Sequence, residues 1–300
     1  MFSTADRATG DHHCAVIGSP IGHSLSPVLH RAGFDALRLS GWTYEAIDCD
    51  AVALPGLVGS LGQDWVGLSV TMPCKVAAAT VADRRSARVE LLGAANTLLC
   101  KGSGWLADNT DVDGVIGALR ARGVDRPGSV LVLGGGGTAA SAVAAVAEMG
   151  ADRVVIATRQ PAGRAAAVEV ASRTGMPVTG CELATQALTE QAAAADLVIS
   201  TVPAGVADPF AGVFADVRVL LDVVYHPWPT ALAAAGRTGR TTVTGLDMLL
   251  HQAVRQFELF TGAPAPVTAM RDALDAAAGR AGGLPEPGKV VDNRGRTAAP

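Results

Sequence analysis

Several features that mark other protein classes are scarce in this sequence of 300 residues. Only 17% of the residues are charged, the formal net charge is -4, and lysine and arginine form no run. Neither nucleic acid nor an anionic membrane is therefore an expected partner. The five cysteines are scattered without a CxxC pair or a supporting histidine set, which favours reduced thiols and predicts no metal site. Small molecules are the expected partners.

Long apolar segments are also missing. Residues 1–13 contain no apolar stretch typical of a secretory signal, and later apolar runs are interrupted by Asp196, Pro203 or Asp222. These runs stay well short of the ~20 residues that a membrane span needs. We expect a cytoplasmic protein. Residues 281–300 are rich in glycine, proline and polar residues without periodicity, which predicts a disordered tail.

What the sequence does have is alternation of apolar runs with alanine-rich stretches, typical of an α/β fold. The length favours two domains with an active-site cleft between them. We predict a βα substrate-binding domain over residues 1–111, joined by a returning helical segment 246–280, and a Rossmann-type domain over 112–245. The expected strands are 14–17, 43–47, 66–70, 96–99, 129–133, 153–157, 197–200, 217–224 and 241–243, and the expected helices include 112–122, 138–149 and 248–260.

A glycine cluster separates the strand 129–133 from the helix that follows it. Such a turn lets the backbone approach a pyrophosphate, and the helix N-terminus supplies free N–H groups. The alternative is a merely flexible turn, but the βαβ context favours dinucleotide binding. The predicted cofactor contacts here are Gly134, Gly135, Gly136, Gly137 and Thr138.

The end of the second strand of this βαβ unit indicates which dinucleotide binds. NAD enzymes usually carry an acidic residue there for the ribose hydroxyl, whereas this chain has Thr158 and Arg159, with Arg164 nearby. Guanidinium groups suit a 2′-phosphate, so NADP is the expected cofactor. A solvated surface position is the alternative for both arginines, more so for Arg164. Thr201, Val223 and Gly245 complete the predicted cofactor set.

Two polar segments are candidates for the chemistry of ketone reduction, which needs a donor at the developing alkoxide and a source of a proton. Lys75 follows the apolar strand 66–70 in a Thr-x-Pro-x-Lys segment, on a turn at the carboxyl edge of a sheet. Asp111 ends Asp-Asn-Thr-Asp at the domain junction and would orient Lys75 if it lay within reach. The alternatives are a solvated lysine and a helix cap at Asp111.

Ser24 and Ser26 lie at the start of a helix, in the segment Gly18–Pro27. Two hydroxyls beside a helix N-terminus suit a carboxylate ligand, because the side-chain and backbone donors converge with the helix dipole. Plain capping of the helix is the alternative. The histidines His23 and His30 are expected to be structural.

Together these segments resemble the shikimate dehydrogenase family, over roughly residues 14 to 275. The matching motifs are GSPIGHSLSPVLH, SVTMPCK, GAANT, DNTDVDG, GGGG, ATR, DLVISTVP, DVVYHP and GLDMLLHQAVRQFELFTG. The resemblance implies reversible reduction of 3-dehydroshikimate to shikimate with NADPH, a step in aromatic amino acid biosynthesis, with Lys75 and Asp111 as the catalytic pair. It also implies that Ser24 and Ser26 hold the substrate carboxylate near Tyr225, and that Thr71, Asn96 and Gln252 address the ring hydroxyls.

The chain departs from the family pattern at a few positions. Ser69 stands where asparagine is common, Thr158 and Gln160 flank Arg159 in place of asparagine and threonine, and Ala139 and Ala140 replace a frequent Ser-Arg pair. Two other functions are weighed: a quinate/shikimate dehydrogenase using NAD, and a non-catalytic sensor of NADP or a shikimate-like acid. Arg159, Ser24 and Ser26 argue against the first, and the Lys75 and Asp111 pair argues against the second. A monomer and a homodimer both remain open.

Overall fold

The computed structural model describes residues 11–102 and 104–280, and it confirms the α/β class. The predicted tail 281–300 lies outside the described residues. The chain divides into two compact units. Unit 1 holds the residues up to Gly114 together with Leu249–Ala277, and unit 2 holds Val115–Met248 and the residues from Ala278 onward. Two helices, α5 (Asp111–Arg120) and α10 (Gly245–Thr261), run in sequence from one unit into the other.

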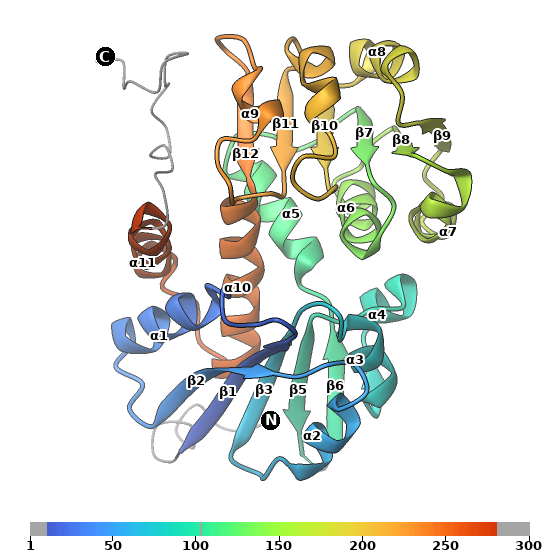
Figure 1. Ribbon diagram of the computed structural model, residues 1–300. Coiled ribbons are helices and arrows are strands. Elements are labelled where there is room, and N and C mark those ends of the chain that lie inside the picture. The colour runs from blue at the N-terminus through green and yellow to red at the C-terminus, as the bar shows by residue number, and fades with distance from the viewer. Residues whose placement is uncertain (1–10, 103, 281–300) are drawn as a thin grey trace. The chain divides into compact units, whose positions relative to one another are not determined.

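Unit 1 is built on a six-stranded mixed sheet, and Figure 1 labels its strands except β4. Its order is β2-β1-β3-β5-β6-β4, with β1 parallel to β2 and β3, and β5 antiparallel to β3 and β6. The strands are β1 (His12–Gly18), β2 (Trp42–Asp48), β3 (Trp65–Val70), β4 (Arg84–Arg85), β5 (Thr97–Lys101) and β6 (Gly104–Asp108). The helices are α1 (Ser26–Ala36), α2 (Leu54–Ser60), α3 (Lys75–Val81), α4 (Ala87–Leu92) and α11 (Val267–Arg280).

Helix α10 contributes an aromatic face to the core of unit 1. Phe257 and Phe260 are fully buried, and a Cβ on Gly33 of α1 or on Gly67 of β3 would overlap their rings. Glycine at these two positions therefore lets the helix approach closely. The side chain of His30 lies in the same cluster, stacked on the ring of Tyr44.

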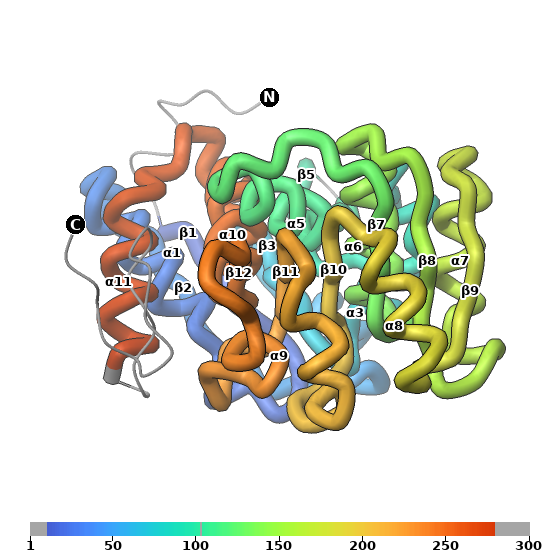
Figure 2. The backbone as a smooth tube through the Cα atoms, turned by 90° about the horizontal axis from the view of Figure 1, so that it is seen from above, coloured from blue at the N-terminus to red at the C-terminus, as the bar shows by residue number. Residues whose placement is uncertain are grey.

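Unit 2 is a parallel sheet with the strand order β12-β11-β10-β7-β8-β9, which Figure 2 shows in sequence across the sheet. The chain starts at β7, adds β8 and β9 on one side, and then returns to add β10, β11 and β12 on the other. This is the doubly wound Rossmann order, whose switch point lies between β7 and β10. The strands are β7 (Ser129–Leu133), β8 (Arg153–Thr158), β9 (Val178–Glu182), β10 (Leu197–Ser200), β11 (Val219–Asp222) and β12 (Thr241–Thr244).

Apolar strands of unit 2 alternate their side chains between two helical layers. Leu131 and Leu133 of β7 belong to a core cluster with Leu188, Phe214 and Leu232, which come from α8, η2 and α9. Helices α6 and α7 pack against each other. The helices are α6 (Gly137–Glu148), α7 (Ala165–Arg173), α8 (Thr185–Ala194) and α9 (Ala231–Ala234), with 3-10 turns η1 (Pro161–Arg164) and η2 (Asp208–Phe214).

Candidate active site

The centre of the site is an ion pair between Lys75 and Asp111 in unit 1. Lys75 Nζ donates to Asp111 Oδ2 at 2.5 Å, and the two side chains are 23% and 10% exposed. Lys75 is the first residue of α3, directly after the turn 71–74 that follows β3, and Asp111 is the first residue of α5. The carboxylate is thus engaged by a side chain and does not act only as a helix cap. The ammonium has two further hydrogens with which to reach a ligand.

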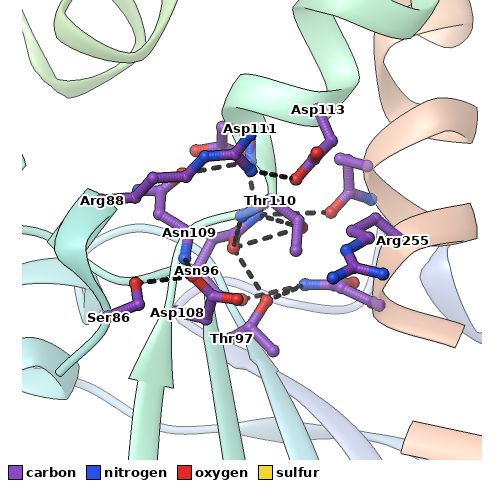
Figure 3. Close-up of polar contacts among 12 residues, drawn as sticks. Ser86, Arg88, Asn96, Thr97, Asp108, Asn109, Thr110, Asp111, Asp113 and Arg255 are labelled. Atoms are coloured by element: carbon purple, nitrogen blue, oxygen red, sulfur yellow. Dashed lines mark hydrogen bonds and ion pairs between the residues drawn. The ribbon is translucent and has the colours of Figure 1, made fainter. Parts of the chain in front are cut away.

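Asn96 connects this pair to Gln252. Its Nδ2 donates to Asp111 Oδ1 at 2.9 Å, to Thr110 Oγ1 at 3.0 Å and to Gln252 Oε1 at 3.4 Å. The two oxygens of Asp111 are therefore held by different donors, Asn96 on one side and Lys75 on the other. Figure 3 shows Asn96, Thr110 and Asp111 meeting at the start of α5. The structure brings together four predicted site residues that are far apart in the sequence.

The segment before Asp111 is held by its own short polar side chains. Asn109 Oδ1 accepts the backbone N–H of Asp111 at 3.1 Å, and Asn109 Nδ2 donates to the carbonyl of Ala94 at 3.0 Å. Asp108 Oδ1 accepts from Ser86 Oγ at 2.7 Å. These bonds fix the point at which α5 begins, and with it the position of the Asp111 carboxylate (Figure 3).

The segment Gly18–Pro27, which contains Ser24 and Ser26, packs beside the turn 71–74 that precedes Lys75. Ser19 N donates to Met72 O at 3.1 Å, and a Cβ on Gly18 would overlap Thr71. Ser24 Oγ accepts the backbone N–H of Ser26 at 3.3 Å, so Ser24 also supports the helix start. Ser24 and Thr71 are half-buried, whereas Ser26 is 6% exposed. The two predicted substrate segments, 18–27 and 69–75, are therefore neighbours.

The glycine-rich turn of unit 2 lies at the switch point of its sheet. Gly134 has φ +106° and lies against Thr201, whose hydroxyl donates to Leu133 O at 2.8 Å. A Cβ on Gly135 would overlap the carbonyl of Gly163, whereas one on Gly136 or Gly137 would meet open space. The first two glycines thus serve the turn and its packing. The last two leave the N-terminus of α6 open to a ligand, as a pyrophosphate requires.

The two arginines after β8 have different surroundings. Arg159 is exposed directly after the end of the strand. Arg164 is half-buried, and its guanidinium donates to the carbonyl of Cys181 at 3.0 Å and to Thr158 Oγ1 at 3.4 Å. Thr158 itself is buried and donates to Gln160 O at 2.8 Å. The Arg159 guanidinium is therefore exposed to solvent, whereas the Arg164 guanidinium also holds the loop through two hydrogen bonds.

Tyr225, Val223 and Gly245 lie together elsewhere in unit 2. A Cβ on Gly245 would overlap the carbonyl of Val223 and would lie 3.2 Å from the Tyr225 ring. Burial raises the pKa of Tyr225, which favours the neutral phenol. Asp222 anchors this loop, because its Oδ2 accepts from Thr230 Oγ1 at 2.7 Å and its Oδ1 from Val224 N at 3.2 Å.

One layer of the site is formed by Tyr44, Ser69 and Gln256. The sequence marked only Ser69 among them, as a departure from the family pattern, and missed Tyr44 and Gln256. All three side chains are buried and bond to one another beneath Asn96. The sequence signal for Gln256 is its spacing four residues after Gln252, which places both amides on one face of α10.

The departures from the family pattern at Ala139 and Ala140 lie inside α6, where both alanine side chains are buried.

Two negative findings apply to the residues that the structure describes. None of its helices has the length and apolar character that crossing a membrane requires. Residues 11–102 and 104–280 also contain no group of three or more His, Cys, Asp or Glu side chains suited to a metal ion.

The strand order of unit 2 and the open glycine turn at its switch point define a dinucleotide-binding α/β protein. Comparison with known families is more specific. Residues 16–98 match the shikimate dehydrogenase substrate binding domain, and residues 245–274 match the shikimate 5'-dehydrogenase C-terminal domain.

Individual relatives cover nearly the whole chain. The shikimate dehydrogenase (NADP(+)) of Citrifermentans bemidjiense is 39% identical over 278 residues, 87% of this chain and 93% of the relative. The crystal structure of Mycobacterium tuberculosis shikimate dehydrogenase is 49% identical with a TM-score of 0.83, covering 89% of this chain and 99% of that one. The Thermus thermophilus enzyme in complex with NADP(H) and shikimate is 32% identical, with a TM-score of 0.77 and coverage of 89% and 99%. The chain belongs to the shikimate dehydrogenase family.

Proposed function

We propose that this protein is a shikimate dehydrogenase, which catalyses the reversible NADPH-dependent reduction of 3-dehydroshikimate to shikimate. The observation that carries the proposal is the Lys75–Asp111 ion pair, surrounded by the amides of Asn96 and Gln252, in a chain of this family. The pair supplies what ketone reduction needs: a positive charge for the developing alkoxide and a transferable proton.

In the proposed reaction, bound NADPH supplies the hydride. Lys75 donates a hydrogen bond to the carbonyl oxygen, stabilises the charge that develops there and transfers a proton to it. Asp111 holds the ammonium in place from the other side through its 2.5 Å contact. Asn96 Nδ2 donates a hydrogen bond to Asp111 Oδ1, which fixes the orientation of the carboxylate. Lys75 therefore binds to Oδ2 alone. In the reverse direction the neutral lysine accepts the proton of the shikimate hydroxyl.

The substrate contacts follow from the neighbouring side chains. We assign Ser24 and Ser26 to the carboxylate together with Tyr225, and Thr71, Asn96 and Gln252 to the ring hydroxyls. Segment 18–27 is adjacent to the turn 71–74, which supports placing the carboxylate and the ring hydroxyls of one small substrate here. We further propose that residues 1–111 with 246–280 form the substrate-binding domain and that residues 112–245 form the NADP-binding domain.

The cofactor would be held by the turn Gly134–Gly137 with Thr138, and by Thr201, Val223 and Gly245. The residues present fit a dinucleotide, since the backbone at Gly136 and Gly137 faces open space. Arg159 would take the 2′-phosphate, and no acidic side chain follows β8 at 159 or 160 to repel it. With all five cysteines present as free thiols, we place the enzyme in the cytoplasm.

A steady-state assay of purified protein with shikimate or quinate, and with NADP or NAD, tests this function. We expect the highest kcat/KM for shikimate with NADP. Preference for quinate with NAD would assign the chain to quinate oxidation. Binding of shikimate and NADP without turnover in any of the four combinations would instead indicate a sensor.

A further inference from the structure

A second layer of buried polar side chains lies beneath the Lys75–Asp111 pair, centred on Gln256 of α10. Gln256 is 1% exposed. Its Nε2 donates to the backbone carbonyl of Asn96 at 3.0 Å and to Thr97 Oγ1 at 2.9 Å, and its Oε1 accepts from Ser69 Oγ at 2.7 Å. Every polar atom of the amide therefore has a partner, and each partner lies on β3 or at the start of β5.

These bonds allow only one arrangement of hydrogens. The carbonyl of Asn96 can only accept, so the nitrogen of the Gln256 amide must face it and the oxygen must face Ser69. Ser69 has a single hydroxyl hydrogen and gives it to Gln256, so its oxygen accepts from the Tyr44 hydroxyl at 2.6 Å. Thr97 receives a hydrogen from Gln256 and passes its own to Asn96 Oδ1 at 2.8 Å.

The hydrogen bonds of Gln256 and Thr97 act on the Lys75–Asp111 pair through the side chain of Asn96. Its Oδ1 receives the hydroxyl of Thr97 and the backbone N–H of Thr110 at 2.7 Å. Its Nδ2 must then face Asp111 Oδ1. In the flipped orientation the amide oxygen would face the carboxylate and repel it. Through Thr97 and the Asn96 carbonyl, the Gln256 amide thus supports the same direction of the Asn96 amide that the Thr110 N–H requires, and with it the orientation of Asp111.

We propose that Gln256 is a positioning residue for the reaction, acting through Asn96 on the Asp111 carboxylate and so on Lys75. Ser69 is its internal partner: its one hydroxyl hydrogen goes to Gln256, its oxygen accepts from Tyr44, and its side chain is buried, so we assign it no contact with the substrate. The inference rests on the proposed function, because it assumes that Lys75 and Asp111 carry the chemistry.

The test is steady-state kinetics and the pH profile of kcat for Gln256→Ala with shikimate and NADP. Loss of alignment should lower kcat about 10- to 100-fold and shift the pH profile, while KM for NADP stays unchanged. Thr261→Val is the matched control. Thr261 is also buried in α10, but its hydroxyl bonds Phe257 O and Ala263 N and touches neither Asn96 nor Thr97. We expect this control to lower Tm and leave kcat and its pH profile unchanged.

Two further variants separate positioning from stability. Gln256→Glu keeps the side-chain shape but places a carboxylate oxygen against the Asn96 carbonyl, so its kcat should fall increasingly as pH rises and the glutamate ionises. Ser69→Asn/Gln256→Ala moves the amide from helix to strand and should recover most of the kcat that Gln256→Ala loses. Gln256→Glu is nearly isosteric, so at low pH, where its carboxyl group is neutral, it provides the test if the alanine variant does not fold.

Normal kcat with an unshifted pH profile in Gln256→Ala, or in Gln256→Glu, would overturn the inference. An equal kinetic loss in Thr261→Val would also overturn it, because the effect would then be one of stability alone. These outcomes are distinct from failure of the proposed function, which would show as an absence of shikimate oxidation in the native protein.

Discussion

His30 is a histidine in an apolar setting, and its titration should make the stability of unit 1 depend on pH. Its side chain is 0% exposed and stacks on Tyr44 with ring centroids 4.2 Å apart. Both ring nitrogens are buried, and the one side chain that favours the charged form, Gln256, contributes less than burial does. Burial lowers the pKa of the imidazole from 6.5 to about 3, because the imidazolium would lose its hydration.

This lowered pKa sets the sign of the effect. Between pH 6.5 and about 3, the unfolded chain binds a proton at His30 that the folded chain excludes. The free energy of unfolding therefore falls as pH falls through this window. At ~1.36 kcal/mol per pH unit, the loss at about pH 4.5 relative to about pH 7.5 is about 3 kcal/mol. His30→Phe keeps an aromatic ring in the stack but cannot be protonated, so it should lose about 3 kcal/mol less than the native chain.

Urea unfolding at the two pH values, followed by circular dichroism, measures this difference. His23→Phe is the control, because His23 is exposed and its replacement removes a histidine without changing the buried one. The control should lose as much stability in acid as the native chain does. Equal acid losses in the native chain and in His30→Phe would refute the reasoning, as would an NMR titration in which His30 protonates near its ordinary pKa.

Three further predictions concern unit 2. Arg159→Ala should raise KM for NADP by about tenfold or more through loss of charge-assisted hydrogen bonds, and leave KM for NAD unchanged; equal effects on both cofactors would make the arginine structural. Gly135→Ala should destabilise the protein by about 1–3 kcal/mol in thermal unfolding, because its Cβ overlaps Gly163, whereas Gly136→Ala should cost almost nothing. Thr230→Val should cost about 1–3 kcal/mol, because it removes both a hydroxyl donor to buried Asp222 and the N-cap of α9, and Thr230→Ser should retain most of that stability; equal Tm losses in the two variants would contradict these roles.

The order of strands and helices in unit 2 was predictable because its central strands are continuous apolar runs bounded by turns. The strands β7, β8 and β10 were expected within a residue of their observed bounds. Strand β9, by contrast, is short and partly exposed and contains Gly180, so it carries no clear apolar pattern. Strand β6 was also not predicted, because its pairing in a hairpin with β5 is a tertiary feature rather than a periodic one.

The candidate site likewise contains residues that the sequence predicts and residues that it does not. Lys75 and Asp111 are candidates in the sequence because their types and their positions after a strand and before a helix suit proton transfer, and the family resemblance implies that they act as a pair. The role of Ser69 did not stand out, because its partner Gln256 lies 187 residues further along the chain. No local pattern encodes such a contact. The different surroundings of Arg159 and Arg164 likewise depend on the carbonyl of Cys181, which only the fold brings near Arg164.

The most direct test of the account is the kinetics of Lys75→Ala, Asp111→Ala and the double variant with shikimate and NADP. Because Lys75 acts mainly in the transition state, its loss should lower kcat by ~100- to 10,000-fold with little change in shikimate affinity. Arginine at this position should rescue poorly, since it does not release a proton near neutral pH. Because the two residues work as a unit, the double variant should be scarcely slower than the slower single variant. Near-normal turnover in Lys75→Ala, or losses that multiply in the double variant, would contradict the central claim.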